Sequence, residues 1–238
     1  MSTHPLKVDM ANSIKEAMKT KALYAYPEHS LAYSYIAKFE YPWQALPSIS
    51  QFILEIGKGL SPDEYDKTGE NIWIAKSAKV APSAYIGGPC IIGKGAEVRH
   101  CAFIRGSAIV GDGAVVGNST ELKNCILFDG VQVPHYNYVG DSILGYKAHM
   151  GAGSVTSNVK SDKTPVVVHA TCESIDTGFK KFGAMLGDYV EVGCNSVLNP
   201  GTVVGADSNI YPLSSVRGFV PAGCIHKTRD NIVQKRKA

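Results

Sequence analysis

The sequence predicts an all-β protein, a triangular parallel β-solenoid with a small helical segment before it. Three observations predict this fold. An aliphatic residue recurs every six positions, a small residue follows it four positions later, and the pattern vanishes in one internal stretch and then returns. Neither the helical period of 3.6 nor the strand period of 2 explains a step of six. A short strand and a turn do explain it, and three such units make one coil.

The repeat begins at Ile74 and continues unbroken to Leu122. Its aliphatic positions are Ile74, Val80, Ile86, Ile92, Val98, Ile104, Val110, Val116 and Leu122. Eight of these nine are followed at the fourth position by a small residue, so the pattern has two independent parts. We expect the aliphatic side chains to fill the prism and the small residues to lie near its corners, where larger ones would collide.

The repeat is imperfect in the middle of the chain. Pro134 breaks the step, Val133 and Val139 restart it one residue early, and it is absent from about 159 to 184. It returns at Leu186 and ends near Val216. We therefore predict a β-helix over 71–225, with an excursion near 159–184 that packs on the outside of the coils or reaches a neighbouring subunit.

The two flanking segments lack the repeat. Residues 1–70 contain helix-start patterns at Ser13, Ser48 and Pro62, so we expect a mostly helical appendage that caps the N-terminal end of the solenoid. Residues 226–238 are polar and basic, and we expect a solvated tail with at most a short helix.

Composition excludes several classes of protein. Lys plus Arg is 24 and Asp plus Glu is 21, a surplus too small to indicate a nucleic-acid partner. No apolar stretch is long enough for a membrane span, and the opening MSTHPLKVDM has no features of a signal peptide. The six cysteines form no CxxC pair. We expect a cytoplasmic protein with reduced thiols and no metal requirement.

Two cations stand one full coil apart. Arg105 and Lys123 each follow an inward aliphatic residue and are separated by 18 positions. They should lie side by side about 4.8 Å apart, where a phosphate would relieve their repulsion. Two solvated surface cations are the alternative.

His135 lies where the repeat breaks, in the run Val133-Pro134-His135-Tyr136. A neutral imidazole accepts a proton near neutral pH, which suits a general base. A structural or solvated loop histidine is the alternative. His100, His149 and His169 would also permit a metal site between subunits, similar to that of a carbonic-anhydrase-like solenoid, although no spacing demands it.

Four runs carry a family resemblance. GNSTELKN (117–124), PHYNYVGD (134–141) and GAGSVTSN (151–158) resemble the acetyltransferase half of bifunctional N-acetylglucosamine-1-phosphate uridylyltransferase/glucosamine-1-phosphate acetyltransferase. DTGFKKFGAMLGD (176–188) is similar to the solenoid half of archaeal-type sugar-1-phosphate nucleotidylyltransferases. The resemblance implies a left-handed parallel β-helix of hexapeptide repeats that acts as a homotrimer, with sites in the clefts between prisms.

The resemblance also implies roles for ten residues. His135 would be the catalytic base, with Glu121 orienting it. The substrate would contact Arg105, Lys123, Tyr138, Asn158 and His149, of which the two cations hold the phosphate. Acetyl-CoA would lie along Ala152, Cys194 and Lys227.

The implied function is acetyl-CoA-dependent N-acetylation of an amino sugar 1-phosphate such as glucosamine 1-phosphate, in nucleotide-sugar synthesis for the cell envelope. Residues 1–70 are too short for the nucleotidyltransferase half and contain no phosphate loop, so we expect that activity to be missing. The alternative is a non-catalytic scaffold or partner of a separate nucleotidyltransferase. His149, which stands where the family often has asparagine, and the added N-terminal segment favour that alternative.

Overall fold

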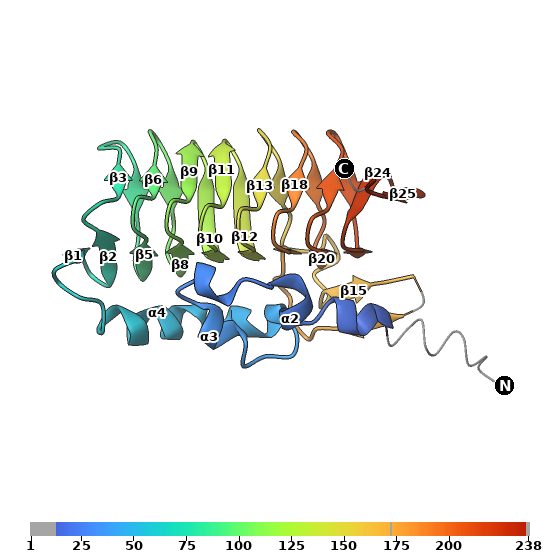
Figure 1. The fold of residues 1–238 in the computed structure, drawn as a ribbon, viewed down its shortest axis with the longest axis horizontal. Helices are drawn as coiled ribbons and strands as arrows, with labels where there is room; N and C mark the ends of the chain where they lie inside the picture. The colour runs from blue at the N-terminus through green and yellow to red at the C-terminus, as the bar shows by residue number, and fades with distance from the viewer. Residues whose placement is uncertain (1–12, 172, 237–238) are drawn as a thin grey trace.

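The computed structural model describes residues 13–171 and 173–236. The opening MSTHPLKVDM, Cys172 and the last two residues of the predicted tail lie outside the described residues. The described chain forms a left-handed parallel β-helix, as the hexapeptide pattern predicts. A layer of short helices lies along one side of it (Figure 1).

Three faces make up the prism, and each coil contributes one strand to each face. The covered face, next to the helices, holds β2 (Ile72–Ala75), β5 (Cys90–Ile92), β8 (Ala108–Val110), the second half of β10 (Glu121–Leu127) and of β12 (Tyr138–Leu144), β17 (Ala184–Leu186), β20 (Thr202–Val204) and β23 (Phe219–Val220). The front face holds β3 (Lys79–Val80), β6 (Glu97–Val98), β9 (Val115–Asn118), β11 (Gln132–His135), β13 (His149–Met150), β18 (Glu191–Val192), β21 (Asn209–Ile210) and β24 (Cys224–Thr228). The rear face holds β4 (Tyr85–Ile86), β7 (Phe103–Ile104), the first half of β10 and of β12, β14 (Val155–Thr156), β19 (Val197–Leu198) and β22 (Ser215–Val216).

The aliphatic residues of the repeat fill the prism. Ile104, Val110, Val116 and Leu122 are fully buried, and Ile104 pairs with Leu122 on the next coil. Coils in this part therefore contain eighteen residues. Because each coil stacks the same residue type on the last, the interior is a continuous apolar column.

The slip after Leu122 has a local cause. Ile109 pairs with Ile126, and Ile126 with Ile143, so these coils contain seventeen residues. Asn124 and Asp141 adopt left-handed backbone conformations, with φ of 49° and 48°. A single left-handed residue thus makes the corner between the rear and covered faces, and β10 and β12 continue through it as seven-residue strands.

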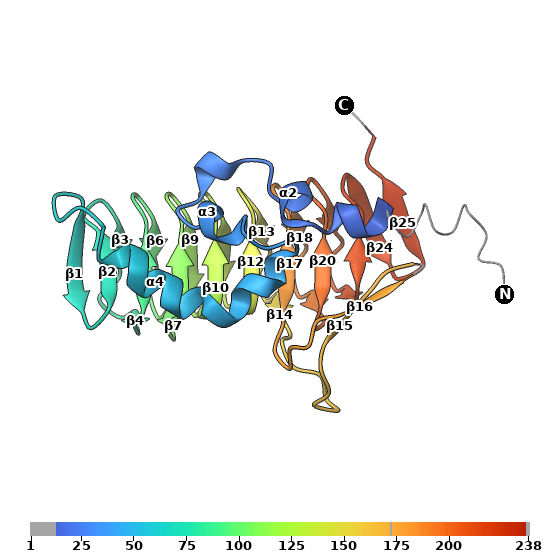
Figure 2. The same ribbon diagram turned by 90° about the horizontal axis from the view of Figure 1, so that it is seen from below.

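The N-terminal layer lies along the prism rather than over its end. It contains a helical turn at 13–17, then α2 (Thr20–Leu23), the 3-10 helix η1 (Pro27–His29), α3 (Tyr33–Ile36), η2 (Pro42–Ser48) and α4 (Ile49–Gly57). α4 contacts β5, β8 and β10, and η2 contacts β12 (Figure 2). The expected cap is therefore wrong, and the antiparallel strand β1 (Tyr65–Gly69) borders the first coil instead.

Outward-facing apolar side chains explain this placement. Ile91, Ile109, Ile126, Ile143 and Met185 occupy the middle of successive strands on the covered face and are at most 1% exposed. Without the helical layer these side chains would face water, at a cost of about 25 cal/mol for each Å² of apolar surface. The layer therefore belongs to the same hydrophobic core as the prism.

The excursion interrupts the coils between β14 and β17. It contains an antiparallel pair, β15 (Val167–His169) and β16 (Ser174–Asp176), and projects beyond the coils in Figure 2. Val166, Val168 and Phe182 are buried, and the Phe182 ring packs on that of Trp43 with centroids 5.6 Å apart. This segment thus joins the helical layer to the prism.

The described part of the C-terminal segment is a hairpin. β24 pairs antiparallel with β25 (Asn231–Gln234), which is exposed along its length. The expected short helix is therefore wrong for residues 226–234, whereas the expected exposure to solvent is confirmed along β25. The backbone of β25 adds to the edge of the front face, so the groups that face β24 are paired.

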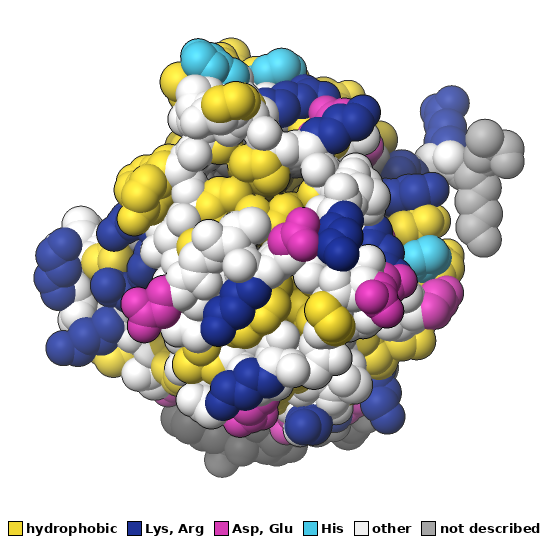
Figure 3. All heavy atoms as spheres, turned by 90° about the vertical axis from the view of Figure 1, so that its left-hand side faces the viewer, with side chains coloured by type: hydrophobic (Ala, Val, Ile, Leu, Met, Phe, Trp, Pro, Cys, Tyr) yellow, Lys and Arg dark blue, Asp and Glu magenta, His cyan; other side chains and the backbone are white. Residues whose placement is uncertain are grey.

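None of the helices described is long and apolar enough to cross a membrane. Figure 3 views the end of the prism that begins with β1, and positive and negative side chains lie among apolar ones there.

Candidate functional site

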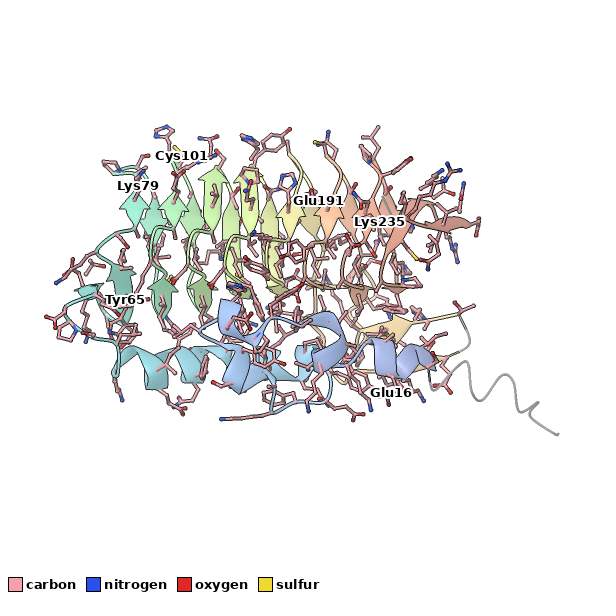
Figure 4. All side chains as sticks on the ribbon, in the orientation of Figure 1. Glu16, Tyr65, Lys79, Cys101, Glu191 and Lys235 are labelled. Atoms are coloured by element: carbon pink, nitrogen blue, oxygen red, sulfur yellow. The ribbon has the colours of Figure 1, made fainter. Side chains whose placement is uncertain are left out.

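The corner between the front and rear faces forms a ridge. Its residues are exposed at 100–101, 118–119, 135–136, 194–195 and 212–213 and half-buried at 152–153. Backbone hydrogen bonds connect successive coils, for example from Gly153 N to His135 O at 3.1 Å and from Asn195 N to Ala152 O at 2.8 Å. Figure 4 shows Cys101 on this ridge, at the edge of the prism farthest from the helices.

His135 is the last residue of β11 and is exposed on the ridge. The strand reaches this position because Gly117 on the preceding coil has no side chain: a Cβ there would lie 1.6 Å from the carbonyl oxygen of Pro134. Tyr136 follows with φ of 37° and turns the chain onto the rear face. His135 is exposed, and no hydrogen bond within the described residues occupies its imidazole ring.

Asn137 fixes this turn, a role that sequence reasoning missed. Its side chain is buried; Oδ1 accepts from His135 N at 3.1 Å and Nδ2 donates to Gly151 O at 2.8 Å. The amide therefore ties the His135 backbone to the next coil. A polar residue buried beside a break in the repeat was the available signal.

Asp141 organises the opposite edge of the rear face. Its carboxylate is 5% exposed and accepts from Lys123 Nζ at 3.1 Å, Asn124 Nδ2 at 2.8 Å and Asn158 Nδ2 at 2.5 Å. The sequence predicted Lys123 and Asn158 as site residues but not the carboxylate that joins them. Asp141 is the last residue of the PHYNYVGD run, which was the only signal for it.

Tyr138 lies between the two edges, on the rear face. Its hydroxyl oxygen accepts from Asn158 Nδ2 at 3.1 Å. Burial, and then the nearby Asp141 carboxylate, raise the pKa of Tyr138. The phenol is therefore neutral at pH 7, and its O–H can donate to a ligand.

Arg105 and Lys123 occupy matching positions on neighbouring coils, because Ile104 pairs with Leu122. Arg105 Nη1 donates to Glu121 Oε1 at 2.8 Å, and this hydrogen bond raises the pKa of Arg105. Glu121 thus pairs with Arg105, and no hydrogen bond within the described residues joins it to His135. The role expected for Glu121 in orienting His135 is not what the geometry shows, because its carboxylate is held by the nearer cation.

A groove of about 350 Å³ opens beside Asp141. Its walls come from Leu46 and Pro47 of η2, from Asn124, and from Lys180 and Lys181 of the excursion. The groove therefore places two further cations at the Asp141 edge of the rear face.

His149 lies apart from these residues. It points outward from the front face, where its Nδ1 lies 2.7 Å from Glu191 Oε2. The structure therefore does not bring it to Tyr138 and Asn158. His100 and His169 are also separate, next to Ser83 and Ser174 respectively. Among the residues described, no three His, Cys, Asp or Glu side chains are grouped as metal ligands.

Ala152, Cys194 and Lys227 follow the ridge toward the C-terminal end. Ala152 and Cys194 lie on successive coils, and Lys227 Nζ lies 5.8 Å from the ring centroid of Tyr211 on the last coil. Small side chains followed by a cation suit a thin extended ligand with an anionic end.

A family model described as the GMPPB C-terminal domain matches residues 86–220. The chain belongs to this family. Its matched region covers the coils from β4 to β23 and includes the ridge, the rear face and the excursion. The GMPPB C-terminal domain family thus accounts for the prism but not for the helical layer.

Curated relatives include a bifunctional sugar-1-phosphate nucleotidylyltransferase/acetyltransferase from Sulfurisphaera tokodaii, which is 35% identical over 108 residues, or 45% of this chain and 27% of that protein. A bifunctional protein GlmU from Methanococcus maripaludis strain C5 is 38% identical over 95 residues, or 40% of this chain and 23% of that protein. The chain thus spans about a quarter of the length of these relatives.

Among solved structures, the acetyltransferase domain of PglB from Neisseria gonorrhoeae, in complex with acetyl coenzyme A, is similar at a TM-score of 0.39 and 17% identity. The similarity covers 69% of this chain and 57% of that chain.

Proposed function

We propose that the protein transfers an acetyl group from acetyl-CoA to the amine of an amino sugar 1-phosphate, at a site on the rear face. One observation carries the proposal. A solvent-facing imidazole stands at one edge of this face, two adjacent cations stand at the other, and a half-buried tyrosine lies between them. An amino sugar phosphate has the same order of groups, an amine at one end and a dianion at the other.

His135 is the proposed general base. An ammonium group has no free electron pair, so the amine must lose a proton before or as it attacks. The exposed ring can take that proton, and Asn137 keeps the backbone beneath it fixed. Acetyl-CoA supplies the acetyl group as a thioester. The nitrogen–carbon bond forms as the carbon–sulfur bond breaks, and the thiolate accepts a proton.

Arg105 and Lys123 are the proposed phosphate ligands, and Tyr138 and Asn158 the proposed sugar ligands. Lys180 and Lys181 line the adjoining groove and add positive charge there. Binding of the phosphate requires Arg105 and Lys123 each to interact with the phosphate as well as with a carboxylate partner. The Arg105–Glu121 pair is exposed, so this rearrangement costs little.

A homotrimer is part of the proposal. The covered face is already occupied by the helical layer, which leaves the front face, the rear face and the ridge between them to meet neighbouring prisms. Tyr85 and Phe103 are exposed there with ring centroids 5.5 Å apart, which supports an apolar contact. A monomeric mass by light scattering at micromolar concentration would contradict the shared cleft.

The test is a panel of amino sugar phosphates incubated with acetyl-CoA, with release of free thiol as the readout. We expect turnover with an amino sugar 1-phosphate. Lys123→Ala should chiefly raise KM for the sugar, because the contact is present in the ground and transition states alike. Lys79→Ala, which removes a cation from the front face, is the matched control.

A specific observation favours a second candidate, a non-catalytic scaffold. Both proposed phosphate ligands are already paired, Arg105 with Glu121 and Lys123 with Asp141. In a scaffold these pairs would be permanent. No thiol release with any member of the panel, together with stable binding of a separate sugar-phosphate nucleotidyltransferase, would establish the scaffold and end the enzyme proposal.

A further inference from the structure

A small cavity lies at the C-terminal end of the prism, apart from the ridge. Its volume is about 160 Å³, and its polar lining comes from Asn199, Ser215, Arg217, His226 and Arg229. It lies between Arg217, at the corner of the rear and covered faces four coils beyond Lys123, and the β24–β25 hairpin. At about 4.8 Å per coil, the two positions are roughly 19 Å apart.

His226 breaks the inward pattern of the repeat. It pairs with Ile210, so it occupies a position that other coils fill with an aliphatic residue. Its side chain is only 4% exposed, and its Nδ1 has no hydrogen-bond partner within the described residues. Burial lowers the pKa of His226, and the residue's own backbone opposes that shift only in part. The ring is therefore neutral at pH 7.

A neutral imidazole has one donor nitrogen and one acceptor nitrogen. A buried polar atom without a partner is costly, and native proteins rarely retain one without a role. Because His226 lines the cavity, a ligand inside the cavity can supply the missing partner.

Two arginines provide the charge. Arg217 and Arg229 are exposed, and neither takes part in an ion pair within residues 13–171 and 173–236. Nearby Lys235, by contrast, is paired with Asp207. Ser215 Oγ accepts from Asn199 Nδ2 at 3.0 Å, which leaves the serine O–H free to donate. The cavity thus collects two guanidinium groups and a hydroxyl, with no carboxylate in its lining.

We propose that this cavity binds a small tetrahedral oxyanion, inorganic phosphate in the cell, between Arg217, Arg229 and His226. Guanidinium groups match phosphate oxygens in pairs, and the hydroxyl and imidazole add donors. The volume equals that of about five waters at ~30 Å³ each, which is enough for a phosphate. This site does not depend on the proposed function.

The test measures binding of inorganic phosphate to the whole protein by isothermal titration calorimetry, at constant ionic strength. We expect saturable binding that weakens by about tenfold or more in Arg217→Gln/Arg229→Gln, since two charge-assisted contacts are lost. Arg99→Gln removes one exposed arginine from another surface and should leave the affinity within about twofold, as expected for distant charges that salt screens.

A further arm locates the anion. The binding that depends on Arg217 and Arg229 should persist in Lys123→Ala, whereas loss of all binding in Lys123→Ala together with full binding in Arg217→Gln/Arg229→Gln would place the phosphate on the rear face and overturn the proposal.

His226→Phe tests the buried ring. It keeps an aromatic group and removes both nitrogens, so we expect phosphate binding to weaken while the circular dichroism spectrum is retained. Wild-type affinity in this variant would show that His226 only fills space and would remove it from the site. Absence of phosphate binding to the wild-type protein would overturn the whole inference.

Discussion

The covered face and the rear face of the prism share one interior but differ on the outside. On the covered face the outward residues of three successive coils are Ile109, Ile126 and Ile143. On the rear face two of the corresponding outward residues are Glu121 and Tyr138. This difference indicates that the inward residues of a hexapeptide repeat specify the fold, while the outward residue decides whether a face is buried by protein or left exposed.

The helical layer and the candidate site are therefore complementary uses of the same scaffold. The outward isoleucines gain stability from burial, and the outward polar residues contribute little to it. Variants on the two faces should separate into those that change stability and those that change activity.

The largest expected difference is in thiol reactivity, between cysteines in the interior of the prism and cysteines on the ridge. Burial raises the pKa of Cys125 to about 12. Because the thiolate is the reactive form, alkylation at neutral pH should be about a thousandfold slower than for an ordinary thiol with pKa ~8.5. Mass spectrometry after iodoacetamide treatment should find Cys101 and Cys194 labelled and Cys125 unlabelled. Equal labelling of all three in the folded protein would show that the prism opens readily.

Ile126→Ala should destabilise the covered face. It leaves a cavity between β10 and α4, and the expected loss in the free energy of unfolding is about 2–5 kcal/mol. Val197→Ala on the rear face is the control; its side chain is partly exposed, and its loss should be below about 1 kcal/mol. Urea unfolding of both variants checks this, and equal losses would mean that the helical layer adds no burial.

Asp141→Ala should have an intermediate effect. It leaves Lys123, Asn124 and Asn158 without their shared acceptor, and we expect a loss of about 1–3 kcal/mol in the free energy of unfolding. Asp141→Asn keeps an acceptor oxygen and should lose less. If the alanine variant unfolds at the same urea concentration as the wild type, the carboxylate is not the organising group of this edge.

Substitution of Asp129 should have the smallest effect on stability, and that effect should depend on pH. Burial raises its pKa, so the folded state holds this proton more tightly than the unfolded state. Its favourable contribution is present at low pH and is lost as pH rises from about 3.9 through the raised native pKa. Asp129→Asn should therefore increase stability at pH 7, by less than about 1 kcal/mol, and flatten the dependence above pH 4. A lower thermal unfolding temperature for Asp129→Asn than for the wild type at pH 7 would contradict this prediction.

Much of the fold could be predicted because the repeat constrains inward residues in every coil, as at Ile104 and Leu122. The placement of the helical layer was missed because outward residues were not compared between faces. Three consecutive apolar residues, as in Cys90-Ile91-Ile92, mark the covered face. The seventeen-residue coils were visible only as a slip, because a left-handed corner at Asn124 has no strong sequence signal.

The candidate site was predicted in part. The separation of eighteen residues, one full coil, predicted that Arg105 lies next to Lys123. The break in the repeat indicated His135 as a candidate. The carboxylate partners of the two cations depend on side-chain geometry, so the role of Asp141 and the pairing of Glu121 with Arg105 could not be read from spacing. The structure places His149 on the front face, which spacing alone could not show because a position in the chain does not reveal which face a strand belongs to.

We propose that the chemistry takes place on the rear face and its ridge, with His135 as the base. Turnover of an amino sugar 1-phosphate with acetyl-CoA by His135→Ala tests it most directly, with His100→Ala, another ridge histidine, as the matched control. We predict that His135→Ala lowers kcat by about 10²–10⁴-fold while its urea midpoint stays at the wild-type value and His100→Ala retains activity. Full activity in His135→Ala would contradict the claim.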